Sequence, residues 1–184
     1  IERLCTTHGI PLWTAFGTAR AALAPEFQYH RLIAGKVVTI GEIEVEPVTV
    51  PHDASEPLQF IFHQPDNGKR LGILTDTGHI TTHIIESFSN LDALLLEFNY
   101  DPEMLETGPY PTMLKQRVGG NHGHLSNHQS IDLLQRMNTE KLVCLIAAHI
   151  SEKNNTPAIV DGLIRQLNKL PVPVLADQSE GFDW

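Results

Sequence analysis

Three apolar segments of this chain each lead to a residue that can bind a metal ion, and this pattern limits the folds open to the chain. The residues are His52, Asp76 and His149, which follow the segments at 48–50, 72–75 and 142–148. Short β-branched or apolar runs closed by turn residues predict buried strands. Strand ends from distant parts of a layered fold converge at one edge, so we expect the three side chains to meet there. Imidazole and carboxylate are the usual protein ligands of Zn²⁺, Mn²⁺ and Fe, so the pattern favours a metal centre.

The length predicts one substantial domain over residues 1–184 rather than two. No apolar run approaches the roughly 20 residues that a transmembrane helix needs, and no signal peptide opens the chain. We therefore expect a cytoplasmic protein without a membrane partner. Cys5 and Cys144 lie far apart in the sequence, so both are expected to be free thiols.

The net charge of −9 argues against a protein that holds nucleic acid on a broad cationic surface. It leaves room for an anionic substrate, because bound divalent cations would be the largest local charges in a site and could capture phosphate. The class of substrate must therefore be decided by the residues of the site.

Hydrophobic periodicity divides the chain into a strand-rich first half and a mixed second half. Strands are predicted at 10–16, 37–40, 43–50, 58–62, 70–75, 92–98, 142–147 and 172–176. Helices are predicted at 17–24, 80–88, 101–105, 112–118, 126–137 and 157–170, with Ser126 as a cap. Asn67-Gly68 predicts a type I′ hairpin turn in an antiparallel sheet. Residues 1–8 look like the last turns of a helix, which suggests that something belongs upstream.

Four motifs in this order resemble the metallo-β-lactamase superfamily. They are Val-Pro-His-Asp-Ala-Ser-Glu-Pro-Leu around His52, Leu-Thr-Asp-Thr-Gly-His around Asp76, Gly-His-Leu-Ser-Asn around His124, and Ala-His-Ile-Ser-Glu-Lys-Asn-Asn around His149. The resemblance is strongest to the small bacterial exonuclease-like members linked to cell-wall regulation, and ribonuclease Z is a more distant likeness. It covers essentially the whole chain. It implies an α+β fold, the four-layer αββα sandwich, with a dinuclear metal site at one edge of the two sheets.

The resemblance also implies a role for each motif residue. His52 would bind the first metal, Asp76 would bridge both metals, and His149 would bind the second. A hydroxide activated by the two metals would attack the substrate. His124 would lie near the substrate phosphate as an acid or an oxyanion stabiliser.

Four further residues are candidates beside the ligands. Ser151 and Asn154 would offer hydrogen bonds to phosphate oxygens. His79 and Glu97 are candidates for the partners that hold metal ligands in place, since His79 follows Asp76 closely and Glu97 ends an apolar strand.

Members of this superfamily normally carry His-x-His-x-Asp-His on an earlier loop, and that motif is absent here. The only His-x-His, at 122–124, has serine where the aspartate would be needed. We expect that the chain lacks its natural N-terminal part, with the first strands and that loop, and natural degeneration of the site is the alternative. The intact protein would bind two divalent ions, Zn or Mn with Fe also open. This chain would hold few or none and be nearly inactive, because two protein ligands rarely hold a catalytic metal.

The sequence thus predicts a metal-dependent hydrolase, a phosphodiesterase or nuclease acting on nucleic acid. Hydrolysis of a small ester, thioester or lactone is the alternative within the same fold. A metal-free relic that docks a partner protein or nucleic acid is the alternative from another class. Unpaired sheet edges would favour self-association of the chain.

Overall fold

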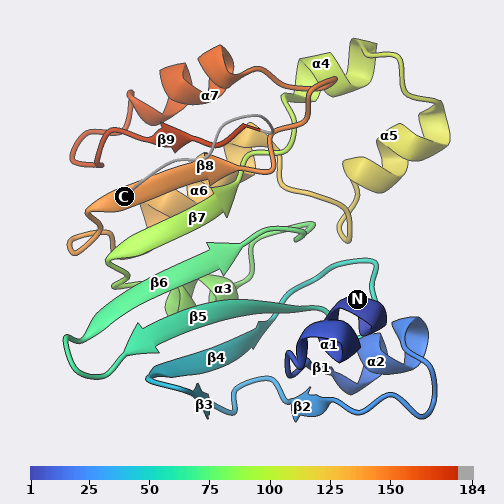
Figure 1. The fold of residues 1–184 in the computed structure, drawn as a ribbon. Coiled ribbons are helices and arrows are strands. Elements are labelled where there is room, and N and C mark those ends of the chain that lie inside the picture. The colour runs from blue at the N-terminus through green and yellow to red at the C-terminus, as the bar shows by residue number, and fades with distance from the viewer. Residues whose placement is uncertain (178–184) are drawn as a thin grey trace.

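A computed structural model describes residues 1–177, and its centre is a mixed sheet of seven strands (Figure 1). The strands are β3 (Val38–Ile40), β4 (Ile43–Thr49), β5 (Leu58–Gln64), β6 (Lys69–Leu74), β7 (Ala93–Glu97), β8 (Cys144–Ala148) and β9 (Val174–Leu175). They lie side by side in sequence order. Neighbours are antiparallel from β3 to β6 and parallel from β6 to β9. The predicted α+β class is confirmed.

The antiparallel half follows from local sequence. Pro47 lies inside β4, where it has no N–H to donate, and β3 pairs with β4 only as far as Val45. The hairpin between β5 and β6 forms as predicted, but the prediction of a type I′ turn is wrong. Gly68 has a φ of 69°, whereas Asn67 is not among the residues of positive φ. The Asn67 side chain instead accepts a hydrogen bond from the Lys69 N–H at 2.9 Å.

The parallel half needs crossovers, and helices supply them. The helices are α3 (Thr82–Ser87) between β6 and β7, then α4 (Pro102–Thr107), α5 (Thr112–Val118) and α6 (Asn127–Arg136) between β7 and β8, and α7 (Pro157–Ile164) before β9. The predicted capping box of α6 is present, with Ser126 and Gln129 bonded reciprocally. Helix α7 is shorter than predicted. Its continuation forms i→i+3 turns from Gln166 and Leu167, and Lys169 then takes a φ of 79°.

The main hydrophobic core joins the sheet to the crossover helices. Its fully buried members include Leu74, Phe88, Leu94, Leu96, Leu133, Leu145 and Ile164. Gly72 allows the closest approach, because a Cβ there would lie 2.5 Å from Leu91 Cδ1 and 2.9 Å from Phe88 Cδ1. The parallel strands are therefore packed against helices on the face of the sheet where Figure 1 shows α3 and α6.

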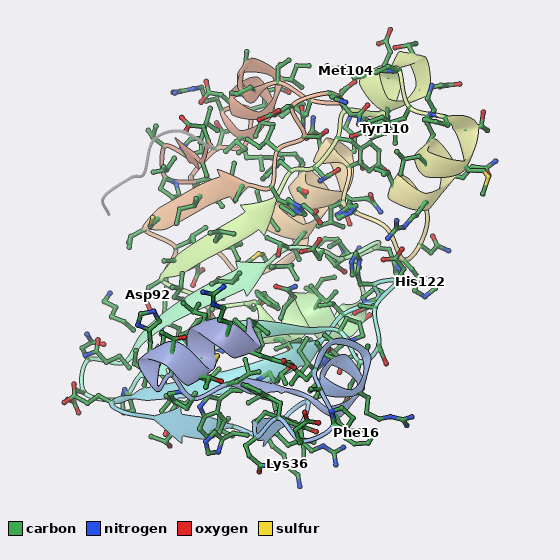
Figure 2. The ribbon with its side chains drawn as sticks, turned by 45° about the vertical axis from the view of Figure 1, so that its right-hand side comes forward. Phe16, Lys36, Asp92, Met104, Tyr110 and His122 are labelled. Carbon is green, nitrogen blue, oxygen red and sulfur yellow. The ribbon has the colours of Figure 1, made fainter. Side chains whose placement is uncertain are left out.

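The first 32 residues add a smaller unit near β3 and β4. It contains α1 (Glu2–His8), β1 (Trp13–Ala15), α2 (Phe16–Ala22) and β2 (His30–Leu32), and β1 and β2 form a parallel pair. Its side chains are drawn in Figure 2. The unit is tied to the loop after His52: the Gly17 N–H donates to Glu56 Oε2 at 2.7 Å, and Thr18 Oγ1 donates to the Ser55 carbonyl at 3.0 Å.

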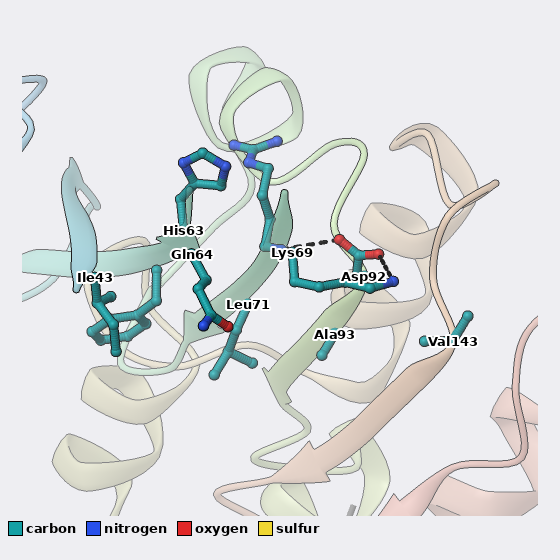
Figure 3. A pocket seen from close by; sticks show the side chains of 10 residues that line it. Ile43, His63, Gln64, Lys69, Leu71, Asp92, Ala93 and Val143 are labelled. Carbon is teal, nitrogen blue, oxygen red and sulfur yellow. Dashed lines mark hydrogen bonds and ion pairs between the residues drawn. The ribbon is translucent and has the colours of Figure 1, made fainter. Parts of the chain in front are cut away.

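A cavity of about 390 Å³ lies at the edge of the sheet where β6 and β7 begin (Figure 3). Beside it, Lys69 Nζ donates to Asp92 Oδ1 at 2.7 Å and the Arg70 N–H donates to Asp92 Oδ2 at 2.9 Å. Asp92 therefore holds the starts of β6 and β7 together. The two cysteines are free, as predicted. No helix within the described residues 1–177 is long and apolar enough to cross a membrane.

Candidate metal centre

The candidate metal centre lies where the three parallel strands β6, β7 and β8 end. Their register pairs Leu74 with Leu96, and Leu96 with Ala147. Asp76, Glu97 and His149 follow these paired residues by one or two positions. Parallel strands have their carboxyl ends at the same edge, so the three side chains are brought together by the register alone.

The fourth member, His124, reaches this edge from the loop between α5 and α6. The Leu125 N–H donates to Glu97 Oε2 at 3.2 Å, and the Leu125 carbonyl accepts from the Asn99 N–H at 3.1 Å. Gly78 lets the loop come close, because a Cβ there would lie 2.3 Å from the Asn121 carbonyl carbon. The turn after Asp76 and the loop before His124 are thus in direct backbone contact.

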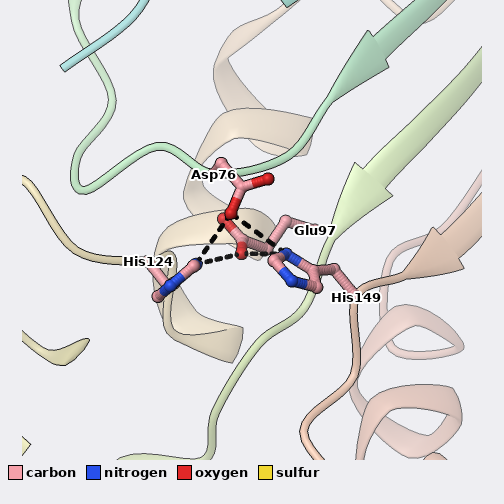
Figure 4. A group of neighbouring side chains, drawn as sticks. All are labelled: Asp76, Glu97, His124 and His149. Carbon is pink, nitrogen blue, oxygen red and sulfur yellow. Dashed lines mark hydrogen bonds and ion pairs between the residues drawn. The ribbon is translucent and has the colours of Figure 1, made fainter. Parts of the chain in front are cut away.

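Side-chain distances define a compact group of two carboxylates and two imidazoles (Figure 4). Glu97 Oε1 lies 2.8 Å from His124 Nδ1 and 2.7 Å from His149 Nδ1. Asp76 Oδ1 lies 3.6 Å from the same atom of His124 and 3.8 Å from that of His149. One ligand atom from each of the four residues lies within 4.8 Å of all the others.

Glu97 is the buried centre of this group. Its side chain is 0% exposed, and its second oxygen, Oε2, accepts hydrogen bonds from the Thr77 and Leu125 N–H groups. Burial raises the pKa of Glu97, but hydrogen bonds from His124 and His149 outweigh it, so the pKa lies below the ordinary value for glutamate. The carboxylate is therefore ionised and faces both imidazoles.

His149 shows the matching change. The hydrogen bond to Glu97 raises its pKa, burial opposes the rise, and the charges of Glu97 and Asp76 add to it. Because Nδ1 faces the Glu97 oxygen, Nε2 of the same ring is left for another partner.

His52, predicted as a ligand of the first metal, lies beside the group of four. Its Nε2 is 4.0 Å from Asp76 Oδ1 and 3.4 Å from Asp53 Oδ1. Its Nδ1 is 3.0 Å from the Gly123 carbonyl, which can only accept, so Nδ1 carries a proton and Nε2 faces the carboxylates. Asp53 is held in turn by Arg117 at 2.6 Å, and that hydrogen bond lowers the pKa of Asp53.

The structure also gives the surroundings of two other residues with predicted roles. The ring of His79 lies against the Asn121 carbonyl, at 2.9 Å from Nδ1, so His79 secures the loop before His124 rather than the carboxylate of Asp76. Asn154 is 1% exposed, and its backbone carbonyl accepts from the Asp101 N–H. Its side chain is therefore buried, and its hydrogen bond to a substrate phosphate stays a prediction.

Ser151 keeps its predicted place near the site. It lines a cavity of about 380 Å³ together with His149. Its Oγ accepts hydrogen bonds from the N–H groups of Lys153 and Asn154, at 3.4 and 3.2 Å, which leaves its own hydroxyl proton available. Its contact with a phosphate stays a prediction.

The donor set fits a divalent cation. Two imidazoles and two carboxylates suit Zn²⁺, Mn²⁺ and Fe²⁺ alike, so the residues choose no single metal. Sequence reasoning placed Glu97 and His124 outside the ligand set; the structure brings both side chains into one group with Asp76 and His149, and their separate roles stay predictions. The signal for Glu97 was present, since it ends an apolar strand that becomes the neighbour of the strand leading to Asp76. For His124, only the loop contacts show its place.

Comparison with known proteins identifies the family of the chain. The model of the β-lactamase superfamily domain matches residues 6–149. Exodeoxyribonuclease YycJ of Bacillus anthracis is 36% identical over 131 residues, which cover 71% of this chain and 49% of that protein. Exodeoxyribonuclease WalJ of Streptococcus pneumoniae serotype 2 is 35% identical over 157 residues, which cover 85% of this chain and 56% of that protein. The chain thus spans about half the length of the curated relatives that it matches.

Solved structures share the fold. Zn²⁺-bound PqqB from Methylobacterium extorquens matches with a TM-score of 0.68 at 15% identity, over 98% of this chain and 68% of that one. At this identity the likeness concerns the arrangement of strands and helices alone.

Proposed function

This chain belongs to the metallo-β-lactamase superfamily, and on that premise we propose that it serves a metal-dependent hydrolase that cleaves phosphodiester bonds in nucleic acid. The observation that carries the proposal is the group formed by Asp76, Glu97, His124 and His149, whose ligand atoms lie within 4.8 Å of one another. The names of the two relatives, both exodeoxyribonucleases, support nucleic acid as the substrate.

Asp76, His124 and His149 would supply ligands to a divalent cation, with Glu97 holding the two imidazoles in place, and His52 with Asp76 would offer a second position beside it. A bound cation would supply a Lewis acid for the phosphoryl group and would make a water molecule acidic enough to attack at neutral pH. This set gives a first cation more protein ligands than the sequence alone predicted. We therefore expect this chain to bind one divalent cation more firmly than a second.

The protein's own residues would orient the reactants. Glu97 fixes the rings of His124 and His149 through their Nδ1 atoms, so that each ring presents Nε2 outward. His52 is oriented in the same sense by the Gly123 carbonyl. The Ser151 hydroxyl would donate a hydrogen bond to a phosphate oxygen at the mouth of the site.

The test combines metal analysis with a panel of substrates. The protein, as its source produces it, would be loaded with Zn²⁺ or Mn²⁺ and offered single- and double-stranded DNA, RNA, bis(p-nitrophenyl) phosphate and S-lactoylglutathione. We expect metal-dependent cleavage of phosphodiesters that is lost in Asp76→Asn. His63→Ala is the matched control, because His63 is an accessible histidine paired with Glu44, away from the four residues.

Two results would contradict the proposal. Cleavage of S-lactoylglutathione alone would identify a thioester hydrolase on the same fold. A metal-loaded protein that cleaves none of these substrates would favour a binding role.

A further inference from the structure

The carboxylates of Asp53 and Asp76 lie near the same ring nitrogen of His52. Asp53 Oδ1 is 3.4 Å from His52 Nε2, and Asp76 Oδ1 is 4.0 Å from that nitrogen. The other ring nitrogen, Nδ1, faces the Gly123 carbonyl at 3.0 Å. The two carboxylates are therefore found at the nitrogen that is left to bind a cation.

These distances are those expected between ligands of one ion. Two atoms that are each about 2.0–2.2 Å from one Zn²⁺ lie roughly 3–4 Å apart, according to the angle between their bonds. The contact between His52 and Asp53 is also longer than a charge-assisted hydrogen bond, which is about 2.7–2.9 Å. The group of four does not include Asp53, so its carboxylate belongs to the neighbouring position, at His52 and Asp76.

The backbone around Asp53 is fixed against the turns that carry the metal centre. The Pro51 carbonyl accepts a hydrogen bond from the Gly78 N–H at 2.7 Å, and the Asp53 N–H donates to the His122 carbonyl at 2.9 Å. Gly78 follows Asp76 by two positions, and His122 belongs to the loop between α5 and α6. The chain on both sides of His52 is thus held next to the centre by contacts that need no cation.

The second oxygen of Asp53 is held by Arg117, near the end of α5. Arg117 Nε lies 2.6 Å from Asp53 Oδ2, so the guanidinium pairs with one carboxylate oxygen while Oδ1 faces His52. The end of α5 also touches the loop of the metal centre, since the Val118 carbonyl accepts from the His124 N–H at 2.9 Å. Carboxylates that bind metals are commonly held by such a hydrogen bond from a neighbouring residue.

A second aspartate with the same kind of ion pair shows what is particular to Asp53. Asp161 Oδ2 lies 2.6 Å from Arg165 Nε, and the side chains of Asp161 and Asp53 are 31% and 33% exposed. Within residues 1–177 no histidine forms an ion pair with Asp161, whereas His52 lies beside Asp53. An arginine partner alone therefore does not account for the place of Oδ1 at the imidazole.

From this arrangement we propose that Asp53 is a ligand of the second cation, together with His52 and Asp76, and that Arg117 holds its carboxylate in place. The proposal rests on the proposed function, because it completes the position beside the first cation. It gives that position a third protein ligand, and three is the usual minimum for a catalytic metal. Two carboxylates and one imidazole suit Zn²⁺, Mn²⁺ and Fe²⁺.

The first experiment counts bound cations. The protein, as its source produces it, would be freed of metal and titrated with Zn²⁺ or Mn²⁺ by calorimetry, and equilibrium dialysis would give the number bound. We expect two cations, and we expect Asp53→Asn to weaken the second by at least about tenfold while the first keeps its affinity. Asp161→Asn is the matched control, because it breaks an ion pair of the same length and similar exposure, and it should change neither affinity.

Absorption spectroscopy tests direct contact between residue 53 and the cation. In Asp53→Cys a thiolate replaces the carboxylate, and a thiolate is a good ligand for Co²⁺. We expect a thiolate-to-cobalt charge-transfer band in this variant, which the unsubstituted protein and Asp161→Cys lack. Cys5 and Cys144 are free thiols in all three proteins and give a common background. Circular dichroism would check that each variant is folded.

Three results would overturn the proposal. They are unchanged affinity for both cations in Asp53→Asn, an equal loss of the second cation in Asp161→Asn, and no charge-transfer band in folded Asp53→Cys with Co²⁺. Binding of a single cation by the unsubstituted protein would also contradict it, whereas the proposed function would stand if that protein cleaved bis(p-nitrophenyl) phosphate. Binding of two cations without cleavage of any phosphodiester would count against the proposed function alone.

Discussion

Asp76 and His149 share a left-handed backbone conformation, with φ angles of 47° and 55°. Asp76 lies two residues past the end of β6 and His149 one residue past the end of β8, and each contributes a side chain to the candidate metal centre. Non-glycine residues in this region carry strain of about 1–3 kcal/mol, and such strain is kept where the surrounding structure supports it. Two residues of one site share this unusual conformation, which supports a functional reason for the positive φ angles of Asp76 and His149.

The strain at Asp76 can be measured by comparing two truncations. Asp76→Ala and Asp76→Gly both remove the carboxylate, but only glycine relieves the positive φ. We expect Asp76→Gly to be more stable than Asp76→Ala by about 1 kcal/mol in urea unfolding with EDTA present. The pair His124→Ala and His124→Gly is the control, since His124 is not among the positive-φ residues and glycine should be the less stable there. If the glycine variant were the less stable one at residue 76 as well as at residue 124, the backbone of Asp76 would not be strained.

Glu97→Gln should weaken metal binding while preserving the shape of the site. The carboxylate holds His124 and His149 at 2.8 and 2.7 Å, and the amide loses its charge. We expect Zn²⁺ affinity to fall by about 10- to 100-fold in calorimetric titration. Glu103→Gln, an exposed change in α4, should leave the affinity unaltered. Unchanged affinity in Glu97→Gln would show that neither imidazole depends on this carboxylate.

Gly78→Ala should disturb the centre through the backbone. A Cβ at residue 78 would lie 2.3 Å from the Asn121 carbonyl and 2.5 Å from the His122 nitrogen, so the loop that carries His124 must move. Both stability and metal affinity should decrease, and proton NMR of the histidine rings would report the displacement. Gly162→Ala is the control: it lies in α7 with nothing within 4 Å, and we expect it to stabilise the protein by up to about 1 kcal/mol.

Asp92, just before β7, should make the stability of the protein depend on pH. The hydrogen bond from Lys69 lowers the pKa of Asp92, burial opposes this, and the Arg70 N–H lowers it further. A depressed folded pKa gives stability that is present above the unfolded value of about 3.9 and is lost as pH falls through the folded value. We therefore expect Asp92→Asn to cost about 1 kcal/mol at pH 7, because Lys69 is exposed and screened, and progressively less in acid.

Urea unfolding at a series of pH values would measure that difference. Asp132→Asn is the matched control, because Asp132 forms an exposed i,i+4 pair with Arg136 and should change stability by less than about 0.5 kcal/mol at any pH. A cost in Asp92→Asn that is constant from pH 7 down to strong acid would contradict the assigned ionisation.

Self-association stays a prediction, and the edge strands of the large sheet are where a second chain could pair. The outer strands of the large sheet are β3 and β9, and β9 has only two residues. Edge strands present unpaired backbone groups to a second chain. Sedimentation velocity at several concentrations should show a mass that rises with concentration, and a constant monomer would contradict this.

Much of the fold was readable from local sequence, because strand alternation, capping and turn residues act over a few positions. The strands leading to His52, Asp76 and His149 and the cap at Ser126 are of this kind. The place of Glu97 depends on which strands become neighbours, and the place of His124 depends on backbone contact with Gly78. The burial of Asn154 goes with a long-range hydrogen bond from the Asp101 N–H to its carbonyl, which no local pattern predicts. Non-local packing decides such positions.

The strands of the large sheet lie in sequence order, so each strand pairs with the strand next to it in the chain. The four side chains of the candidate metal centre, in contrast, come from positions spread between residues 76 and 149. A cation held by them would close several chain loops at once, in the manner of a reversible cross-link. Closing long loops removes conformations from the unfolded chain, and binding to the folded state alone raises the midpoint of thermal unfolding with metal concentration. A bound metal would thus stabilise the folded state, and its release would lower the stability of β6, β7 and β8 together.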